Sequence, residues 1–353
     1  MSWVESQTFW RGINVGATLL SSLLEMEEVE LCFPQLLKTS CRKPKHSSSH
    51  ILLLSVLLSV VSLLTVSLNM LVIIAILHFR QLHTSTNMIL LSLAFSDFFV
   101  GFLFLFQLMM VDGCWYLGNL MCALFGILDL IIVSASVGNM VLISIDRYVA
   151  ICDPLHYPTK VTLKRARVSV SLCWTCSVIY STVMLRENLD NLDKFSSCAG
   201  DCTADFGITG FIIDLFLTFL IPITVILVLY AIVFVVAVSQ IQIMRSQVSV
   251  LTSRYSVKAI PKKSEIKAAR TLGLVIIVFL SCLCPYFCIS LLSLDSLLHT
   301  LTGVYVMSLF YFNSCLNPLI YALFYPWFRK SIKIIVTLKI FKSGSSNVNL
   351  LHP

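Results

Sequence analysis

The sequence predicts an all-α membrane protein: a bundle of seven transmembrane helices followed by a short amphipathic cytoplasmic helix. Two observations carry this prediction. Only 12% of the 353 residues are charged whereas 58% are hydrophobic. A soluble domain carries about 25% charged residues, so this chain cannot cover a water-exposed surface in proportion to its length. Seven apolar stretches are also long enough to cross a bilayer, which takes about 20 helical residues each.

The seven stretches are expected to be helices. They lack the alternation of a β-barrel strand, and backbone in lipid must satisfy its own hydrogen bonds. No internal repeat is visible, which disfavours an inverted-repeat transporter. We expect the spans near residues 51–78, 87–111, 120–145, 168–185, 207–238, 269–294 and 302–324.

The basic residues of the loops predict the orientation, because cytoplasmic loops carry an excess of Lys and Arg. With the N-terminus outside, eighteen of the 25 Lys and Arg residues fall in cytoplasmic segments. The outer loops then hold only Arg186 and Lys194. We therefore expect a multi-pass plasma-membrane protein with an extracellular N-terminus and a cytoplasmic C-terminus.

The chain divides into three parts. Residues 1–50 are expected to form an extracellular tail, with 1–25 as an upstream extension before Met26. Residues 51–324 form the membrane domain, and residues 325–353 form the cytoplasmic amphipathic helix and tail. The net charge is +7, but the basic residues lie between apolar runs rather than on one exposed folded face. The lipid bilayer, and not nucleic acid, is therefore the expected partner.

Three carboxylates, those of Asp97, Asp129 and Asp214, stand inside apolar spans. A carboxylate at membrane depth is costly unless it is paired, so such residues mark functional positions. Asp129 lies 18 residues before Arg147, which is five turns and about 27 Å on an ideal helix. Both side chains then face the bundle interior, at opposite ends of the third span. Asp214 lies eight residues before Pro222, about two turns toward the outer side.

Asp129 and Asp214 together indicate a ligand with two positive charges. No Lys or Arg lies deep in any span to neutralise them. Two unpaired carboxylates that face one cavity repel each other, and a diamine would relieve both. Two internal alternatives stay open: Ser or Tyr hydroxyls could satisfy Asp129, and Asp214 could find an ion-pair or hydrogen-bond partner inside the bundle.

Aromatic side chains are expected to line the rest of this cavity. Tyr286, Phe287, Phe310 and Tyr311 lie close to the helix-breaking prolines of the last two spans. Aromatic faces attract organic cations, although ordinary helix packing would also account for each of them. Tyr311 is the strongest candidate, because its hydroxyl could hold the Asp129 carboxylate.

A series of motifs then stands in order, each on its own span. The first two spans contain SLNMLVII and LAFSD, the third ends in SIDRYVAICDPLHYP, and the fourth contains Trp174. The last three contain FLIPITVILVLY, FLSCLCPYF and NSCLNPLIYALFYPWF. From about residue 50 to 335 the chain resembles a rhodopsin-like (class A) G-protein-coupled receptor. The strings HFRQLHTSTN, CWYLG and ALFYPWFRKSIK look like trace amine-associated receptors, and among these like the fish olfactory, diamine-recognising type.

The resemblance implies a non-enzymatic chemosensory receptor. Its ligand would be a small cationic amine, held as a diamine by Asp129 and Asp214. Its partner would be a heterotrimeric G protein of the stimulatory or olfactory type, which raises cAMP. In keeping with this, the sequence contains no nucleophile elbow, phosphate loop or metal-ligand cluster.

The resemblance also implies two disulfides at the outer surface, which is an oxidising environment. Cys122 would pair with Cys202. Cys198 would pair with an N-terminal cysteine, either Cys32 or Cys41, and the sequence leaves this choice open.

Several residues are expected to transmit the signal to the cytoplasmic side. An Arg147–Glu265 ion pair would keep the inactive state closed, and its loss would accompany a helix movement. Tyr230 and Tyr321 would swing inward to stabilise the open state. The full expected set is Asp146, Arg147, Tyr148, Tyr230, Glu265, Phe279, Pro285, Asn317, Pro318 and Tyr321.

Asp97 is expected to centre a buried polar cluster. A buried polar group is costly without partners, and the resemblance implies that this cluster binds water and an allosteric sodium ion. No other cofactor is expected. The members of the cluster are Asn69, Asp97, Ser136, Asn313 and Asn317.

One departure from the class A pattern leaves alternatives open. The sixth span usually carries Trp two residues before its proline, and here that residue is Leu283. A receptor of the same fold that no longer signals is therefore an alternative. A receptor of this fold that senses monoamines is another. A transporter is a much weaker alternative. A retinal pump would need a Schiff-base Lys, and residues 302–324 contain no Lys.

Overall fold

The computed structural model describes residues 30–43, 48–203, 207–250, 263–292, 301–324, 326–342 and 344–350. Within these ranges some side chains, including those of Glu265 and Tyr321, also lie outside the described part of the chain.

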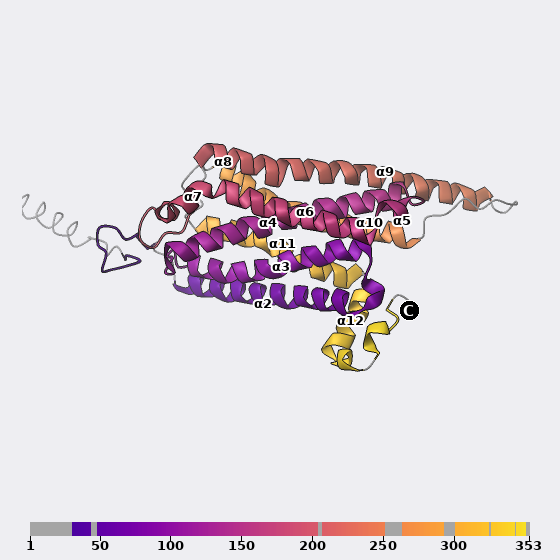
Figure 1. The fold of residues 1–353 in the computed structure, drawn as a ribbon, viewed down its shortest axis with the longest axis horizontal. Helices are drawn as coiled ribbons and strands as arrows, with labels where there is room; N and C mark the ends of the chain where they lie inside the picture. Colours follow the sequence, from indigo (N-terminus) through magenta and orange to yellow (C-terminus); the bar gives the residue numbers. More distant parts are fainter. Residues whose placement is uncertain are drawn as a thin grey trace, which may run out of the picture.

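Seven long helical elements run side by side along the longest axis of the molecule (Figure 1). The fifth is one continuous helix, in which α8 passes through a π-helical segment, η3, into α9. The seven elements are α2 (Ser48–His78), α3 (Ser85–Met110), α4 (Gly118–Cys152), α6 (Leu163–Met184), α8–η3–α9 (Gly207–Asp214, Leu215–Leu220, Ile221–Val250), α10 (Lys263–Leu292) and α11 (Leu301–Phe324). The predicted seven-helix bundle is confirmed.

Short helical segments lie between these elements or follow the last of them. They are η1 (Arg80–Leu82), α5 (Tyr157–Lys160), α7 (Arg186–Asp190), η2 (Leu192–Phe195), α12 (Pro326–Val336), η4 (Lys339–Phe341) and η5 (Ser345–Asn347). Among the described residues, four helical stretches are long and apolar enough by themselves to cross a membrane: Ser48–His78, Ser85–Met110, Gly118–Cys152 and Gly207–Val236.

Several helices extend further than the apolar runs that predicted them, and α4 and α6 are two examples. α4 continues to Cys152, seven residues past the expected end, and α6 begins at Leu163, five residues before the expected start. The added turns contain charged residues, Asp146 and Arg147 in α4 and Lys164, Arg165 and Arg167 in α6, which lie outside the apolar runs. Capping does locate the start of α6, where the Thr162 hydroxyl accepts a hydrogen bond from the Arg165 backbone N–H at 3.3 Å.

α4 lies at the centre of the bundle, where it packs against α3, α6 and α9. Gly138 lets α4 approach α6 closely, because a Cβ at this position would collide with Sγ of Cys173. The indole N–H of Trp174 donates to Ser92 Oγ at 3.0 Å and fixes α6 against α3. These two contacts set the position of α6 beside the central helix.

The outer faces of the bundle are apolar. Leu63, Val183 and Phe234 are each more than two-thirds exposed. Soluble monomers rarely expose large contiguous apolar patches. This surface is therefore suited to lipid.

Three disulfides gather at one end of the bundle, which we call the disulfide end. Cys122 of α4 pairs with Cys202, and Cys198 pairs with Cys41 rather than with Cys32. Cys32 instead pairs with Cys114, a bond that the sequence analysis missed. Residues 30–43 are thereby tied to both the α3–α4 loop and the segment between η2 and α8.

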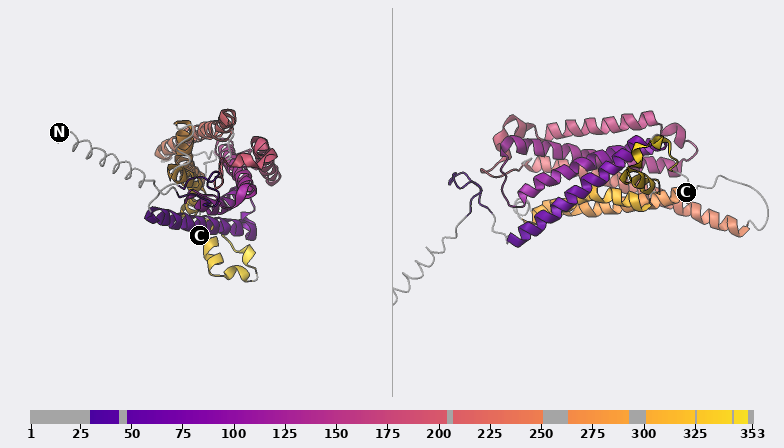
Figure 2. Two further views of the ribbon diagram at one scale, coloured as in Figure 1. Left: turned by 90° about the vertical axis from the view of Figure 1, so that its left-hand side faces the viewer. Right: turned by 90° about the horizontal axis from the view of Figure 1, so that it is seen from below.

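The opposite end carries α12, and we call it the α12 end (Figure 1). α12 is amphipathic, with Phe328 buried and Arg329 and Lys333 exposed. Beyond it the chain folds back beside α2 (Figure 2). There Leu350 is 2% exposed, and its backbone N–H donates to Gln81 Oε1 at 3.0 Å.

Candidate functional site

A cavity of about 40 Å³ lies inside the bundle between α4, α8–η3, α10 and α11. All six residues that the sequence predicts as ligand contacts line it: Asp129, Asp214, Tyr286, Phe287, Phe310 and Tyr311. We call it the acidic cavity. The sequence analysis missed the remaining lining residues, although most lie one to five residues from a predicted one: Leu130, Val133, Ser134, Thr218 and Met307.

Asp129 faces the acidic cavity from α4 with one oxygen occupied. The hydroxyl of Tyr311, a side chain only 2% exposed, donates to Asp129 Oδ1 at 2.6 Å. The expected Tyr311–Asp129 contact is therefore present. Within the described residues Oδ2 has no hydrogen-bond donor, so it is available to a ligand.

Asp214 faces the same cavity from the end of α8. The hydroxyl of Tyr180, in α6, donates to Asp214 Oδ1 at 2.5 Å. Thr218 donates to the same oxygen at 3.0 Å and also to the Asp214 carbonyl at 2.7 Å. Thr218 belongs to the π-helical segment η3, a kind of distortion that often occurs at functional sites. Asp214 thus has internal partners, but only for one of its two oxygens.

The charged side chains in the described lining of the cavity are all acidic. Its described lining contains two carboxylates and no Lys, Arg or His. Two buried anions without a counter-charge are unfavourable at low dielectric, where charge interactions are strong. A ligand that brings positive charge would reduce this cost.

Aromatic rings form the wall between the two carboxylates. The ring of Tyr286 lies 5.3 Å from that of Phe310, measured between centroids, and Phe310 lies 5.8 Å from Tyr311. Phe287 stacks on Phe219 at 4.3 Å. Such faces favour an alkylammonium over a strongly hydrated inorganic cation.

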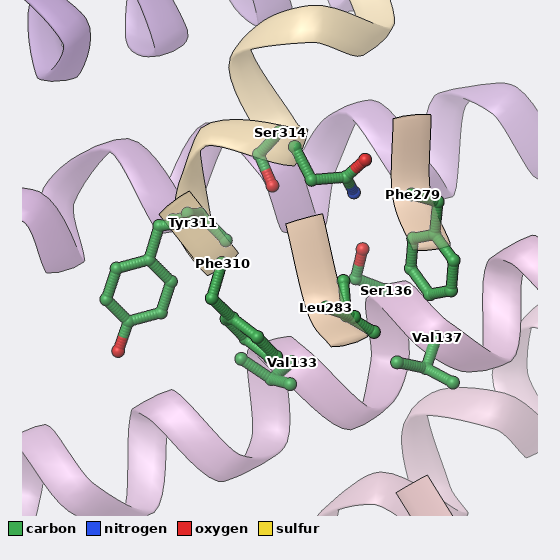
Figure 3. A pocket seen from close by; sticks show the side chains of 10 residues that line it. Val133, Ser136, Val137, Phe279, Leu283, Phe310, Tyr311 and Ser314 are labelled. Atoms are coloured by element: carbon green, nitrogen blue, oxygen red, sulfur yellow. The ribbon is translucent and has the colours of Figure 1, made fainter. Parts of the chain in front are cut away.

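A second, smaller cavity of about 20 Å³ shares part of its lining with the first. Figure 3 shows this second cavity from close by. Phe310 and Tyr311 line both, and Leu283 contributes to the second one only. In the close view Leu283 lies between Phe310 and Phe279, where its side chain is 2% exposed. The residue that departs from the class A pattern therefore sits directly beside the acidic cavity.

The second cavity borders the Asp97 cluster, since Ser136, Asn313 and Ser314 also line it. Ser314 and Ser136 donate to Asp97 Oδ1 at 2.8 and 3.4 Å, and Asn317 Nδ2 donates to Oδ2 at 2.8 Å. Of the predicted cluster, Ser136 and Asn317 thus contact Asp97 directly, and Ser314 is a further partner that the sequence analysis missed.

The donor set of the cluster fits a hard cation. In the described part of the chain the side-chain oxygens of Asn69, Asn313 and Asn317 are buried and have no hydrogen-bond donor. Together with the Asp97 carboxylate they offer the oxygen ligands that such ions prefer. Asn69 Nδ2 donates to the Ser314 carbonyl at 3.0 Å and links α2 to α11 around the cluster.

A polar network occupies the α12 end of α4. Arg147 pairs with Asp146 and donates to Thr86 Oγ1 at 2.7 Å. Tyr157 donates to Asp146 Oδ1 at 2.8 Å, and Thr86 donates to Oδ2 at 3.0 Å. The sequence analysis missed the two hydroxyl residues, which come from other helices.

The remaining predicted signalling residues are only partly described. Tyr148 and Tyr230 are half-buried, and Phe279 is packed in the core with Leu283. Pro285 and Pro318 stand inside α10 and α11. The side chains of Glu265 and Tyr321 lie outside the described residues, so the Arg147–Glu265 pair and the movement of Tyr321 stay predictions.

Comparison with known proteins identifies the family. A family model described as 7 transmembrane receptor (rhodopsin family) matches residues 68–321. Trace amine-associated receptor 13c of Danio rerio is 38% identical over 337 residues, which cover 92% of this chain and 97% of the relative. Trace amine-associated receptor 9 of Rattus norvegicus is 39% identical over 334 residues, which cover 91% of this chain and 98% of the relative.

A relative from a primate is also a trace amine-associated receptor. Trace amine-associated receptor 6 of Pan troglodytes is 36% identical over 334 residues, which cover 91% of this chain and 96% of the relative. The family match over residues 68–321 includes every residue that lines the acidic cavity. The chain therefore belongs to the trace amine-associated receptors of the rhodopsin-like family, which are multi-pass plasma-membrane receptors that sense amines, act through G proteins and are not enzymes.

Proposed function

We propose that this receptor is an olfactory sensor of diamines, in which Asp129 and Asp214 each bind one ammonium group. One observation carries the proposal: both carboxylates line a single cavity whose described lining has no basic side chain. A monoamine would neutralise only one of them, whereas a diamine neutralises both.

The aromatic lining of the cavity supports a ligand with an alkane chain between its two charged ends. Such a chain can lie against the rings of Tyr286 and Phe310. Organic cations gain about 0.5–2 kcal/mol from such faces.

We further propose that the α12 end is cytoplasmic and binds a stimulatory G protein, so that an agonist raises cAMP. The three disulfides support this orientation, because disulfides persist in oxidising surroundings. An allosteric sodium ion would bind at Asp97, where carboxylate and amide oxygens meet.

The test is a cAMP dose-response in transfected cells with a straight-chain diamine and a monoamine of equal length. Asp129→Asn should abolish both responses. Asp214→Asn should weaken the diamine response by about tenfold to a hundredfold, as expected for the loss of a charged partner, and should leave the monoamine response nearly unchanged. An unchanged diamine response in Asp214→Asn would refute the two-carboxylate model.

A receptor for monoamines is the second candidate. Tyr180 and Thr218 both donate to Asp214, so this carboxylate could be a purely internal hydrogen-bond acceptor. In that case the wild-type receptor would not prefer the diamine, and Asp214→Asn would affect the two ligands equally.

A further inference from the structure

Tyr180 reaches the site from a helix that otherwise takes no part in it. None of the residues that line the acidic cavity belongs to α6. The Tyr180 hydroxyl nevertheless lies 2.5 Å from Asp214 Oδ1. This hydrogen bond connects α6 directly to a carboxylate of the ligand cavity.

The two carboxylates are held in the same way. A tyrosine of a neighbouring helix donates to Oδ1 in each case, Tyr311 for Asp129 and Tyr180 for Asp214. Within the described residues, Oδ2 of each carboxylate has no donor. Each tyrosine thereby restricts the rotation of its carboxylate and determines where the free oxygen lies.

The second donor to Asp214 cannot replace this restraint. Thr218 lies four residues further along the same helix, so it moves together with Asp214. Tyr180 stands on α6, which Gly138 and Trp174 fix against α4 and α3. The Tyr180 hydrogen bond therefore holds Asp214 in a fixed position relative to α3 and α4.

We propose that Tyr180 is a positioning residue that sets the length of the diamine the receptor prefers. It does so by fixing the place of Asp214 Oδ2 relative to Asp129 Oδ2. This inference rests on the proposed binding of diamines by the two aspartates. Two ammonium groups joined by a chain reach both oxygens only if the chain matches their separation, so a fixed separation selects one chain length.

The experiment compares Tyr180→Phe with the wild type in a cAMP assay, using the diamines from propanediamine to octanediamine and the matching monoamines. The variant keeps the ring and removes the hydroxyl. The potency of the preferred diamine should fall by about tenfold or more, since a hydrogen bond to a charged group is lost. The dependence on chain length should become flatter, and the potency of monoamines should stay nearly unchanged.

Three further variants make the result specific. Tyr311→Phe removes the matched hydroxyl at Asp129 and should weaken monoamines and diamines alike. Thr218→Val removes the donor from the same helix and should lower diamine potency while the preferred length stays the same. Thr182→Val, an exposed position on α6, should resemble the wild type.

The outcomes separate this inference from the proposed function. The ratio of diamine to monoamine potency and the preferred length do not depend on how much receptor reaches the surface, so a folding defect would not imitate the result. If Asp214→Asn removes the preference for diamines but Tyr180→Phe alters neither measure, the positioning role is refuted and the diamine site stands. If the wild type prefers no diamine, both are refuted.

Discussion

Replacing Leu283 by Trp would restore the residue that rhodopsin-like receptors usually carry, yet the structure indicates that this substitution lowers the stability of this receptor. The Leu283 side chain is 2% exposed and borders a cavity of about 20 Å³. The indole-bearing side chain has six more heavy atoms than that of leucine. About 10–15 Å³ of such volume is needed to hold one water. This cavity therefore has room for about one or two of the six additional heavy atoms.

The remaining atoms must displace neighbours. Phe279 and Phe310 flank Leu283 (Figure 3), and both are packed in the core. Overpacking of this kind costs about 1–3 kcal/mol. At about 2 °C per kcal/mol for a chain of this size, the Tm of Leu283→Trp should fall by about 2–6 °C.

The assay is thermal unfolding in detergent, followed with a thiol-reactive dye that reports exposure of the free cysteines. The scan rate must be kept constant, because unfolding of such proteins is often irreversible. Leu283→Met keeps the volume and serves as the matched control, with a cost below about 1.5 kcal/mol. Phe310 also lines the acidic cavity, so Leu283→Trp should lower diamine potency in the cAMP assay. A Tm equal to or above that of the wild type would refute the reasoning.

Three other predictions concern regions outside the acidic cavity. Asp97→Asn should remove any effect of replacing sodium by choline on the amine dose-response, and a persisting sodium effect would exclude this site. Replacing Cys32 and Cys114 by Ser should cost about 2–4 kcal/mol of stability, measured as a lower Tm, and an unchanged Tm would show that the bond contributes nothing. Leu350→Asp should free the tail from Gln81 and raise its hydrogen-exchange rate about tenfold or more, since burial of a leucine contributes about 1.5–3 kcal/mol; equal rates would contradict the docking.

The residues of the acidic cavity that the sequence predicted are those with a local signature. Asp129 and Asp214 stand out because charge is rare inside apolar spans, and Tyr286 and Phe287 directly follow a conspicuous proline. Tyr180 has no such signature. It is one tyrosine in an apolar helix, and only the approach of α6 to α8 brings its hydroxyl to a carboxylate 34 residues away in sequence.

The pairing of the cysteines likewise could not be predicted in full from the sequence. The sequence narrowed the partner of Cys198 to Cys32 or Cys41, and the structure joins it to Cys41. Cys114 is the first residue of the motif CWYLG, but its partner is 82 residues away. Pairing depends on the distance between two loops, which composition and spacing do not encode.

By itself the sequence determined the seven-helix architecture and the identity of the buried acids, because lipid imposes a strong and local rule: spanning segments must be apolar and helical, and a charge inside them needs a reason. Only the tertiary structure decided how those acids are held. The donors to Asp129 and Asp214 come from α11 and α6. Which hydroxyl meets which carboxylate depends on the rotation and spacing of helices packed against each other, a property of the whole bundle and not of any one segment.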